Sequence, residues 1–311
     1  MLMLATLVGC NSTPYRDDYA RHVNTMKKAP MEASAFRMIF SDGDQVDLRA
    51  LYDNDTTMGN SNVLYQGAPG AAGLIALVAQ IGVHSSIVSS QREERLATLQ
   101  DSANSQIQPL LNIVGNIQLS QLLAPEHKPW LAPSLSSDMD TLYVKPIFFS
   151  NTDMTQLSVK VVAWIPDPNG SKKHPDKYKN LIHVVNAPLS DEQRTSLING
   201  DQVLLQQMLA KLLGTAMNIT YGATTGKFAG VKGTMKTYKM PNAGKNKVFR
   251  ASHIADTCEH TVVRNLRQWL IAIPKAQQAG NLANQGTDTS NSENSVNAQS
   301  ISTEGQCTAG V

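Results

Sequence analysis

Alternating apolar and polar residues near the start of the chain predict two strands. Residues 35–40 form the first strand-like run, and Val46, Leu48 and Ala50 alternate with polar neighbours in the second. Asp42, Gly43 and Asp44 between the runs are typical of a turn. The pattern therefore predicts a β-hairpin over 35–50.

Helical spacing replaces this alternation further along the chain. Residues 70–88 contain no charged residue, which favours a helix buried in the domain, since Gln80, His84 and two serines argue against a membrane span. A second helix is predicted over 107–117 from the spacing of its apolar residues, with Pro109 in its first turn.

Three segments in the middle of the chain read as consecutive antiparallel strands. They cover 141–150, 156–166 and 178–187, and Asp167-Pro168-Asn169-Gly170 marks a turn after the second segment. Val162 and Trp164 occupy the face of that segment that should be polar, which predicts a strand covered on both sides at its end.

Helices are predicted again in the C-terminal third. Ser190 and Gln193 form a capping box, and paired apolar residues repeat every four positions over 204–217. Residues 234–240 and 245–251 read as a hairpin. A last helix, capped by Asp256 or Thr257 and ending before Pro274, is expected to bury Cys258, Val262, Val263, Leu266, Trp269 and Leu270.

These elements predict an α+β or mixed α/β fold, with an antiparallel meander and hairpins packed against long helices in a single domain. The expected organisation is a signal peptide over 1–9, a lipidated N-terminus and tether over 10–34, the domain over 35–275 and a disordered polar tail over 276–311. The tail lacks the large apolar residues that would offset its chain entropy.

Composition narrows the class of protein modestly. The chain has 311 residues, 41% of them hydrophobic, and a formal net charge of +2, so no global field draws it to nucleic acid. Cys258 reads as a core residue and Cys307 lies in the tail, so no structural disulfide is expected between them.

Clusters that resemble catalytic or metal sites are weak in this sequence. His253, Asp256, Cys258, Glu259 and His260 lie close together, but no second His or Cys cluster completes a metal site, so neither a metal nor a cofactor is predicted. Residues 222–227 resemble a phosphate loop, but Phe228 stands where Ser or Thr is needed. No Gly-x-Ser-x-Gly elbow occurs.

A run of positive charge is the clearest candidate binding feature. It contains seven basic residues and no Asp or Glu: Lys227, Lys232, Lys236, Lys239, Lys245, Lys247 and Arg250. Two interpretations remain open. The run is a surface for anionic headgroups, lipopolysaccharide, a cell-wall polymer or an acidic partner, or it is a solvated hairpin whose lysines block edge-to-edge strand pairing.

The N-terminal run Leu7-Val8-Gly9-Cys10 resembles the lipobox of bacterial lipoproteins, which are cut before a cysteine that then carries the lipid. This resemblance implies lipidation of Cys10 and, with Asn11 next to it, an outer-membrane location facing the periplasm. No Lys or Arg precedes Arg16. Either the translation start lies upstream, or the run is an ordinary N-terminus and Cys10 an ordinary thiol.

Three further stretches resemble a group of uncharacterised proteobacterial lipoproteins: 70–75, the meander with 135–142 and 178–180, and 258–274. The resemblance spans most of 36–274 and implies the anchor and one domain, but no activity and no site residues. The sequence therefore predicts a lipid-anchored envelope protein. Three hypotheses describe its function. It is a non-catalytic binding or scaffolding component, an envelope hydrolase using Asp138, Asp140 and His183, or an accessory lipoprotein of a secretion or transport system.

Overall fold

The computed structural model describes residues 36–51, 97–131, 140–171, 174–242 and 245–275. Within them, nine strands form one mixed sheet in the order β1-β3-β4-β5-β9-β8-β7-β6, with β2 also paired to β3. The strands are β1 (Phe36–Phe40), β2 (Leu48–Leu51), β3 (Asp140–Asn151), β4 (Leu157–Ser171), β5 (His174–Val185), β6 (Met235–Asn242), β7 (Lys245–Asp256), β8 (His260–Asn265) and β9 (Leu270–Pro274).

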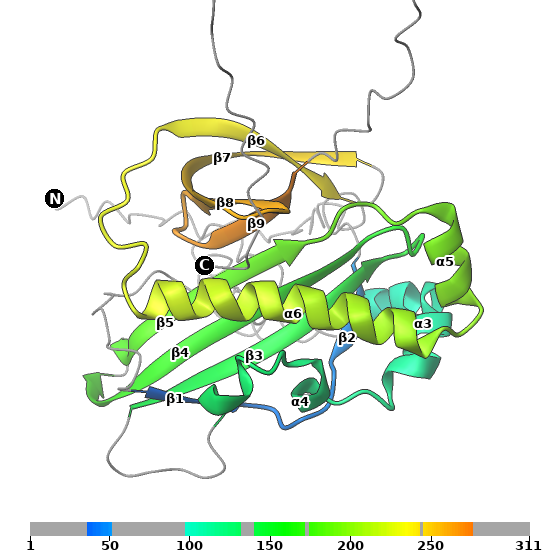
Figure 1. Ribbon diagram of the computed structural model, residues 1–311, viewed down its shortest axis with the longest axis horizontal. Coiled ribbons are helices and arrows are strands. Elements are labelled where there is room, and N and C mark those ends of the chain that lie inside the picture. Colours follow the sequence, from blue (N-terminus) through cyan, green and yellow to red (C-terminus); the bar gives the residue numbers. More distant parts are fainter. Residues whose placement is uncertain (1–35, 52–96, 132–139, 172–173, 243–244, 276–311) are drawn as a thin grey trace, which may run out of the picture.

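Two antiparallel meanders make up most of this sheet. Strands β3, β4 and β5 form the first, and β6 to β9 form the second (Figure 1). They meet where β5 and β9 run parallel over three residue pairs, from Ile182↔Leu270 to Val184↔Ala272. This short seam joins two regions that are otherwise built from local pairings.

Some helices precede the first meander in sequence, and the last two lie between the meanders. They are α3 (Gln108–Val114), α4 (Leu119–Leu122), a 3-10 turn η2 (Lys128–Trp130), α5 (Asp191–Ile198) and α6 (Gln202–Thr224), and residues 97–106 are also helical. Helix α6 crosses β3, β4 and β5 on one side, which we call the helix face (Figure 1).

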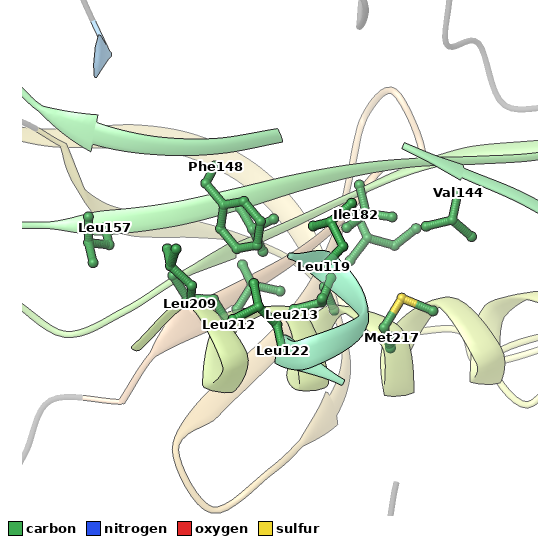
Figure 2. Close-up of a cluster of buried hydrophobic side chains, with 14 of the residues drawn as sticks. Leu119, Leu122, Val144, Phe148, Leu157, Ile182, Leu209, Leu212, Leu213 and Met217 are labelled. Atoms are coloured by element: carbon green, nitrogen blue, oxygen red, sulfur yellow. The ribbon is translucent and has the colours of Figure 1, made fainter. Parts of the chain in front are cut away.

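The main core fills the space between α6 and the helix face. Phe148 of β3, Ile182 of β5 and Leu213 of α6 are each completely buried there. Figure 2 shows Leu209, Leu212 and Leu213 directed from the helix toward these strands. Each buried side chain of this size removes enough apolar surface from water to contribute about 1.5–3 kcal/mol.

The elements with the strongest local signals lie where the sequence predicts them. Helix α5 begins with the reciprocal capping box of Ser190 and Gln193, α6 carries the four-residue apolar repeat, and α3 has proline in its first turn. Strands β3, β4 and β5 form the predicted meander. Both faces of β4 are buried over 157–163, the first part of the strand, whereas the end of the strand, where this burial was expected, is mostly exposed beyond Ile165.

The predicted N-terminal hairpin is wrong. β1 and β2 do not pair with each other; both run parallel to β3, at opposite ends of it. The Ser41 amide donates to the Val144 carbonyl and the Phe148 amide to the Asp47 carbonyl. The connecting segment therefore follows β3 instead of reversing, because β3 is long enough to take both strands along one edge.

The predicted last helix is also wrong, since 260–274 forms strands β8 and β9. Thr261, Val262 and Val263 are β-branched, which favours a strand. The side chain of Asn265 accepts hydrogen bonds from the amides of Arg267 and Trp269, and Gln268 adopts a φ of 66°. This tight turn reverses the chain, and the apparent helical spacing came from combining apolar residues of two sheet faces.

The predicted fold class is corrected accordingly. The described residues are not an α+β or mixed α/β arrangement of hairpins packed against long helices, because strands make up 42% and helices 31% of them. One helix, α6, is long, and the mixed sheet dominates the fold. Strand β1 pairs parallel to β3, and β9 pairs parallel to β5. Both pairings join residues far apart in the sequence, and sequence periodicity does not encode such contacts.

Candidate functional site

The β6–β7 hairpin is the part of the molecule that carries the predicted basic run. Strands β6 and β7 pair from Met235↔Ser252 to Asn242↔Lys245. Strand β8 pairs with β7 only from Ala251 onward. Residues Thr237–Asn242 and Lys245–Arg250 therefore have no further strand partner within the described residues. We call this two-stranded ribbon the arm.

The two faces of the arm differ in burial. One face contributes Tyr238, Met240 and Phe249 to a small apolar cluster with Val185 of β5 and Ile271 of β9. Met240 is 5% exposed. We call this the inner face. An isolated two-stranded hairpin is marginally stable in water, so this cluster is what holds the arm against the sheet.

The other face of the arm, which we call the outer face, is formed by Thr237, Lys239, Val248 and Arg250. Register pairs Thr237 with Arg250 and Lys239 with Val248, and all four side chains are exposed. Val248 is 58% exposed, an unusual environment for a strand valine. The outer face thus presents two cations beside an uncovered aliphatic side chain.

The loop from α6 to β6 brings two more of the predicted cations to the base of the arm. Lys227 and Lys232 are exposed on it. Between them, the buried Phe228 packs against Gly222, and its carbonyl accepts a hydrogen bond of 2.9 Å from Arg264 Nη2. This contact ties the loop to β8, and burial lowers the pKa of Arg264 without removing its charge.

Gly233 fixes the point where this loop joins β6. A Cβ at this position would lie 2.1 Å from the His253 carbonyl oxygen and 2.9 Å from its amide nitrogen. No side chain fits there, because backbone atoms cannot move aside as a flexible side chain does. The close approach sets the start of β6 against β7 and so positions the arm.

The structure does not gather all seven predicted residues on one face. Lys239 and Arg250 share the outer face, and Lys227 and Lys232 lie on the adjoining loop. Lys236 alternates to the side of Tyr238 and Met240, although it is exposed. Lys245 and Lys247 belong to β7, opposite Asn242 and Met240. The structure does not describe the side chains of Lys245 and Lys247.

The charge of the C-terminal meander sets it apart from the rest of the chain. Residues 227–275 contain ten Lys or Arg and two Asp or Glu, a formal charge of +8, whereas the whole chain carries +2. The remainder is therefore negative by six charges. Within the described residues, no ion pair involves the exposed cations of the arm and its loop, while Lys145, Lys179 and Lys211 each pair with a carboxylate.

Two apolar residues of this region were not predicted to be surface residues. Leu266, expected in the core of a helix, lies in the β8–β9 turn and is 69% exposed. This turn follows Asn265, which pairs with Ala251 at the base of the arm. Its sequence Asn265-Leu266-Arg267-Gln268 carries a turn signal, but nothing in the sequence indicates the exposure of Val248.

The residues considered for metal binding are all engaged in other contacts. His253 Nε2 lies 2.7 Å from Asp256 Oδ2, Glu259 pairs with Lys211, and His260 Nε2 lies 3.1 Å from the Val185 carbonyl. Among the described residues, no group of three His, Cys, Asp or Glu side chains could hold a metal ion.

Cys258 is disulfide-bonded, whereas the sequence predicts no disulfide between it and Cys307. Its partner lies outside the described residues and is one of the two other cysteines, Cys10 or Cys307. Cys258 sits in the β7–β8 turn, not in the helix core where the sequence was expected to bury it. A cysteine on a sheet turn is accessible to a distant part of the chain.

The geometry does not support the hydrolase hypothesis, which needs Asp138, Asp140 and His183 in one site. Asp138 lies outside the described residues. Asp140 begins β3, whereas His183 of β5 pairs with Lys160, which pairs with Ile147. Asp140 is seven residues from Ile147, or ~23 Å along the strand. These groups are therefore too far apart for one catalytic centre.

The sequence that resembles a phosphate loop lies at the wrong end of a helix. Residues 222–224 are the last turn of α6, and Gly226 follows with a φ of 79°. Phosphates bind at helix N-termini, where amide groups and the helix dipole attract negative charge. Residues 222–224 lie at the carbonyl end of α6, which offers no free amide groups and carries the negative end of the helix dipole, so it does not attract a phosphate.

One buried polar cluster lies away from the arm, under the end of α6. Tyr178 and Asn180 of β5 are buried, and the Tyr178 hydroxyl and the Asn180 side-chain nitrogen lack a hydrogen-bond partner of good geometry. Burial raises the pKa of Tyr178 to about 12, although Thr224 and Asn180 lie close enough to oppose this rise. The hydroxyl is therefore protonated at neutral pH and is no base.

Comparisons with known proteins found no relative of this chain. No family model matches it, and neither the curated proteins nor the solved structures include a significant match. In the described residues, no helix combines the length and apolar character needed to cross a membrane. The predicted buried helix over 70–88 lies outside those residues.

Proposed function

We propose that the protein is a non-catalytic binding or scaffolding component of the cell envelope, anchored through Cys10, and that the arm binds an anionic envelope component. One observation carries this proposal. The outer face of the arm exposes Lys239 and Arg250 without a carboxylate partner in the described residues, in a segment that contains no Asp or Glu from 227 to 250.

The alternative reading of these lysines is protection of an exposed sheet edge. Lysine and proline on an edge strand prevent strand addition, and Lys239 and Pro241 both lie on β6. This role also accounts for Arg250, because β7 has no second strand partner there, but it does not account for Lys227 and Lys232, which lie on the loop and belong to no strand. Edge protection and binding by charge are therefore compatible, and a partner that adds a strand is disfavoured.

The disulfide of Cys258 supports an exported protein, because structural disulfides persist in oxidising compartments such as the periplasm. It also adds a condition. A lipid and a disulfide cannot share one sulfur, so acylation of Cys10 leaves Cys307 as the partner of Cys258. Mass spectrometry of the native protein would test both assignments at once, and a Cys10–Cys258 peptide would overturn the anchor.

The binding proposal is tested with the doubly substituted variant Lys239→Glu/Arg250→Glu. The wild-type chain should retain anionic components from solubilised envelopes, and the variant should lose most of this binding, because opposite charges on the outer face repel the partner. Lys128→Glu is the matched control, since Lys128 is exposed on η2, remote in sequence from the arm.

Equal retention by wild type and the double variant would overturn the proposal. Cleavage of cell-wall fragments by the purified wild-type chain would favour the hydrolase hypothesis instead. Thermal melting of each variant checks that it folds, and exposed substitutions of this kind usually change stability by about 0.5 kcal/mol or less.

A further inference from the structure

The outer face of the arm combines two kinds of exposed side chain. Lys239 and Arg250 are cationic, and Val248 lies between them in the ladder, directly opposite Lys239. Charge and aliphatic surface therefore occur together in one part of the sheet.

We infer that this surface binds an anionic lipid bilayer, with Lys239 and Arg250 at the phosphate headgroups and Val248 in the headgroup region. The inference rests on the proposed function and names the anionic component. Polybasic surfaces are attracted to anionic lipids, and apolar side chains beside basic ones strengthen attachment to the membrane interface.

An acidic protein fits this surface less well. The cores of protein interfaces are enriched in aromatic residues and depleted of lysine, and the aromatic residues of the arm, Tyr238 and Phe249, belong to its inner cluster. A phosphate-bearing bilayer needs no complementary pocket. It matches charge over an area, and aliphatic side chains enter it without a specific partner.

The distance from the anchor permits this contact. Cys10 lies 26 residues before Phe36, the first described residue. A chain of that length spans at most ~90 Å when fully extended, which exceeds the dimensions of a domain of this size. The arm can therefore reach the bilayer that holds the lipid, and its binding would fix the orientation of the domain on the membrane.

The test measures sedimentation of the full chain carrying Cys10→Ser with vesicles, so that no lipid contributes. Vesicles of phosphatidylglycerol and phosphatidylethanolamine in equal parts should bind it at least tenfold more tightly than phosphatidylcholine vesicles. Replacing Lys239 and Arg250 by Gln should weaken binding roughly 25-fold, or about fivefold for each charge near an anionic surface. Lys128→Gln is the control and should bind as the parent does.

The aliphatic part of the inference has its own variant. Val248→Ser should weaken vesicle binding about fivefold and leave its salt dependence unchanged, because it removes apolar surface and no charge. Raising the salt from 0.15 M to 1 M should release the parent chain, since the Debye length falls from about 8 Å to about 3 Å.

A second probe separates this inference from the proposed function. Dextran sulfate is a soluble polyanion without a bilayer. Binding to dextran sulfate but not to anionic vesicles would overturn the lipid inference and leave the proposed function standing. Binding to neither would overturn both. Equal binding of the Lys239→Gln/Arg250→Gln variant and the parent to anionic vesicles would also overturn the inference.

Discussion

The first meander with its helices and the second meander with its arm belong to one sheet, yet they are built differently. In the first, β3, β4 and β5 pack against α6, and the core includes completely buried residues such as Phe148 and Leu213. In the second, the arm extends past β8 and is held by a small cluster around Met240. Stability is concentrated in one region and exposed charge in the other.

This difference teaches how a single sheet can carry a binding surface. Cations clustered on a thin element repel one another, and they lose free energy if they are buried without partners. Two lysines of the first meander form ion pairs, Lys145 with Asp42 and Lys179 with Asp176. The arm leaves its cations exposed, and the rigid first meander supplies the stability that the arm lacks.

The largest effect is expected in the core of the first region. Phe148→Ala should lower the free energy of unfolding by about 3–5 kcal/mol, because it removes a completely buried ring and leaves a cavity against α6. Chemical denaturation measures this loss. A loss below 1 kcal/mol would mean that the two regions do not differ as described.

A smaller loss is expected where the arm joins the sheet. Gly233→Ala should cost about 1–3 kcal/mol, as overpacked substitutions do, because its Cβ meets the His253 backbone at 2.1 Å. The same denaturation experiment measures it. Gly115→Ala is the control, since a Cβ there has nothing within 4 Å and Gly115 has a φ of −57°.

Truncating the inner face should loosen the arm more than it destabilises the protein. Tyr238→Ala removes a partly buried ring that packs with Phe249 at 6.4 Å between ring centroids. We expect faster amide exchange over 237–250 and a loss in global stability of about 1 kcal/mol. Equal acceleration in β4 would show that the arm and the first meander unfold as one unit.

The smallest effect concerns His260, which lies where the two meanders meet. Burial lowers the pKa of His260, so its neutral form is favoured in the folded state, and it contacts the Val185 carbonyl. The unfolded chain then binds the extra proton first, and stability falls as the pH drops below about 6.5 toward the lowered pKa.

His260→Gln keeps a donor for the Val185 carbonyl but does not titrate. It should flatten the decline in melting temperature between pH 7.5 and 5.5 at a cost of about 1 kcal/mol or less. An unchanged pH profile in this variant would assign the decline to other groups.

Local signals predicted much of the first region. The capping box of α5, the apolar repeat of α6 and the strands β3 to β5 each depend on neighbouring residues. The arm was also predicted, since its strands flank a clear turn. Two predictions failed: a helix was expected where 260–274 forms strands, and the pairing of the two N-terminal runs was nonlocal. The β1 and β2 runs alternate correctly, but no pattern in them tells whether they pair with each other or with β3.

The candidate site shows the same division. The absence of Asp and Glu between 227 and 250 marked a basic segment. The alternation of β6 separated Lys236 from Lys239, but it did not indicate that the inner face would pack against Val185, leaving Val248 and Arg250 outside. The exposure of Leu266 was missed because the sequence predicted a helix where the structure has the β8–β9 turn.

The sequence by itself determined the charge of the arm, the strongest strands and the helices with clear caps or repeats, because these depend on residues close together in the chain. Tertiary structure alone decided the parallel seam between β5 and β9, the place of β1 and β2 beside β3, and which arm residues face solvent. Those outcomes depend on contacts between residues far apart in sequence, where burial of one face decides what the other face exposes.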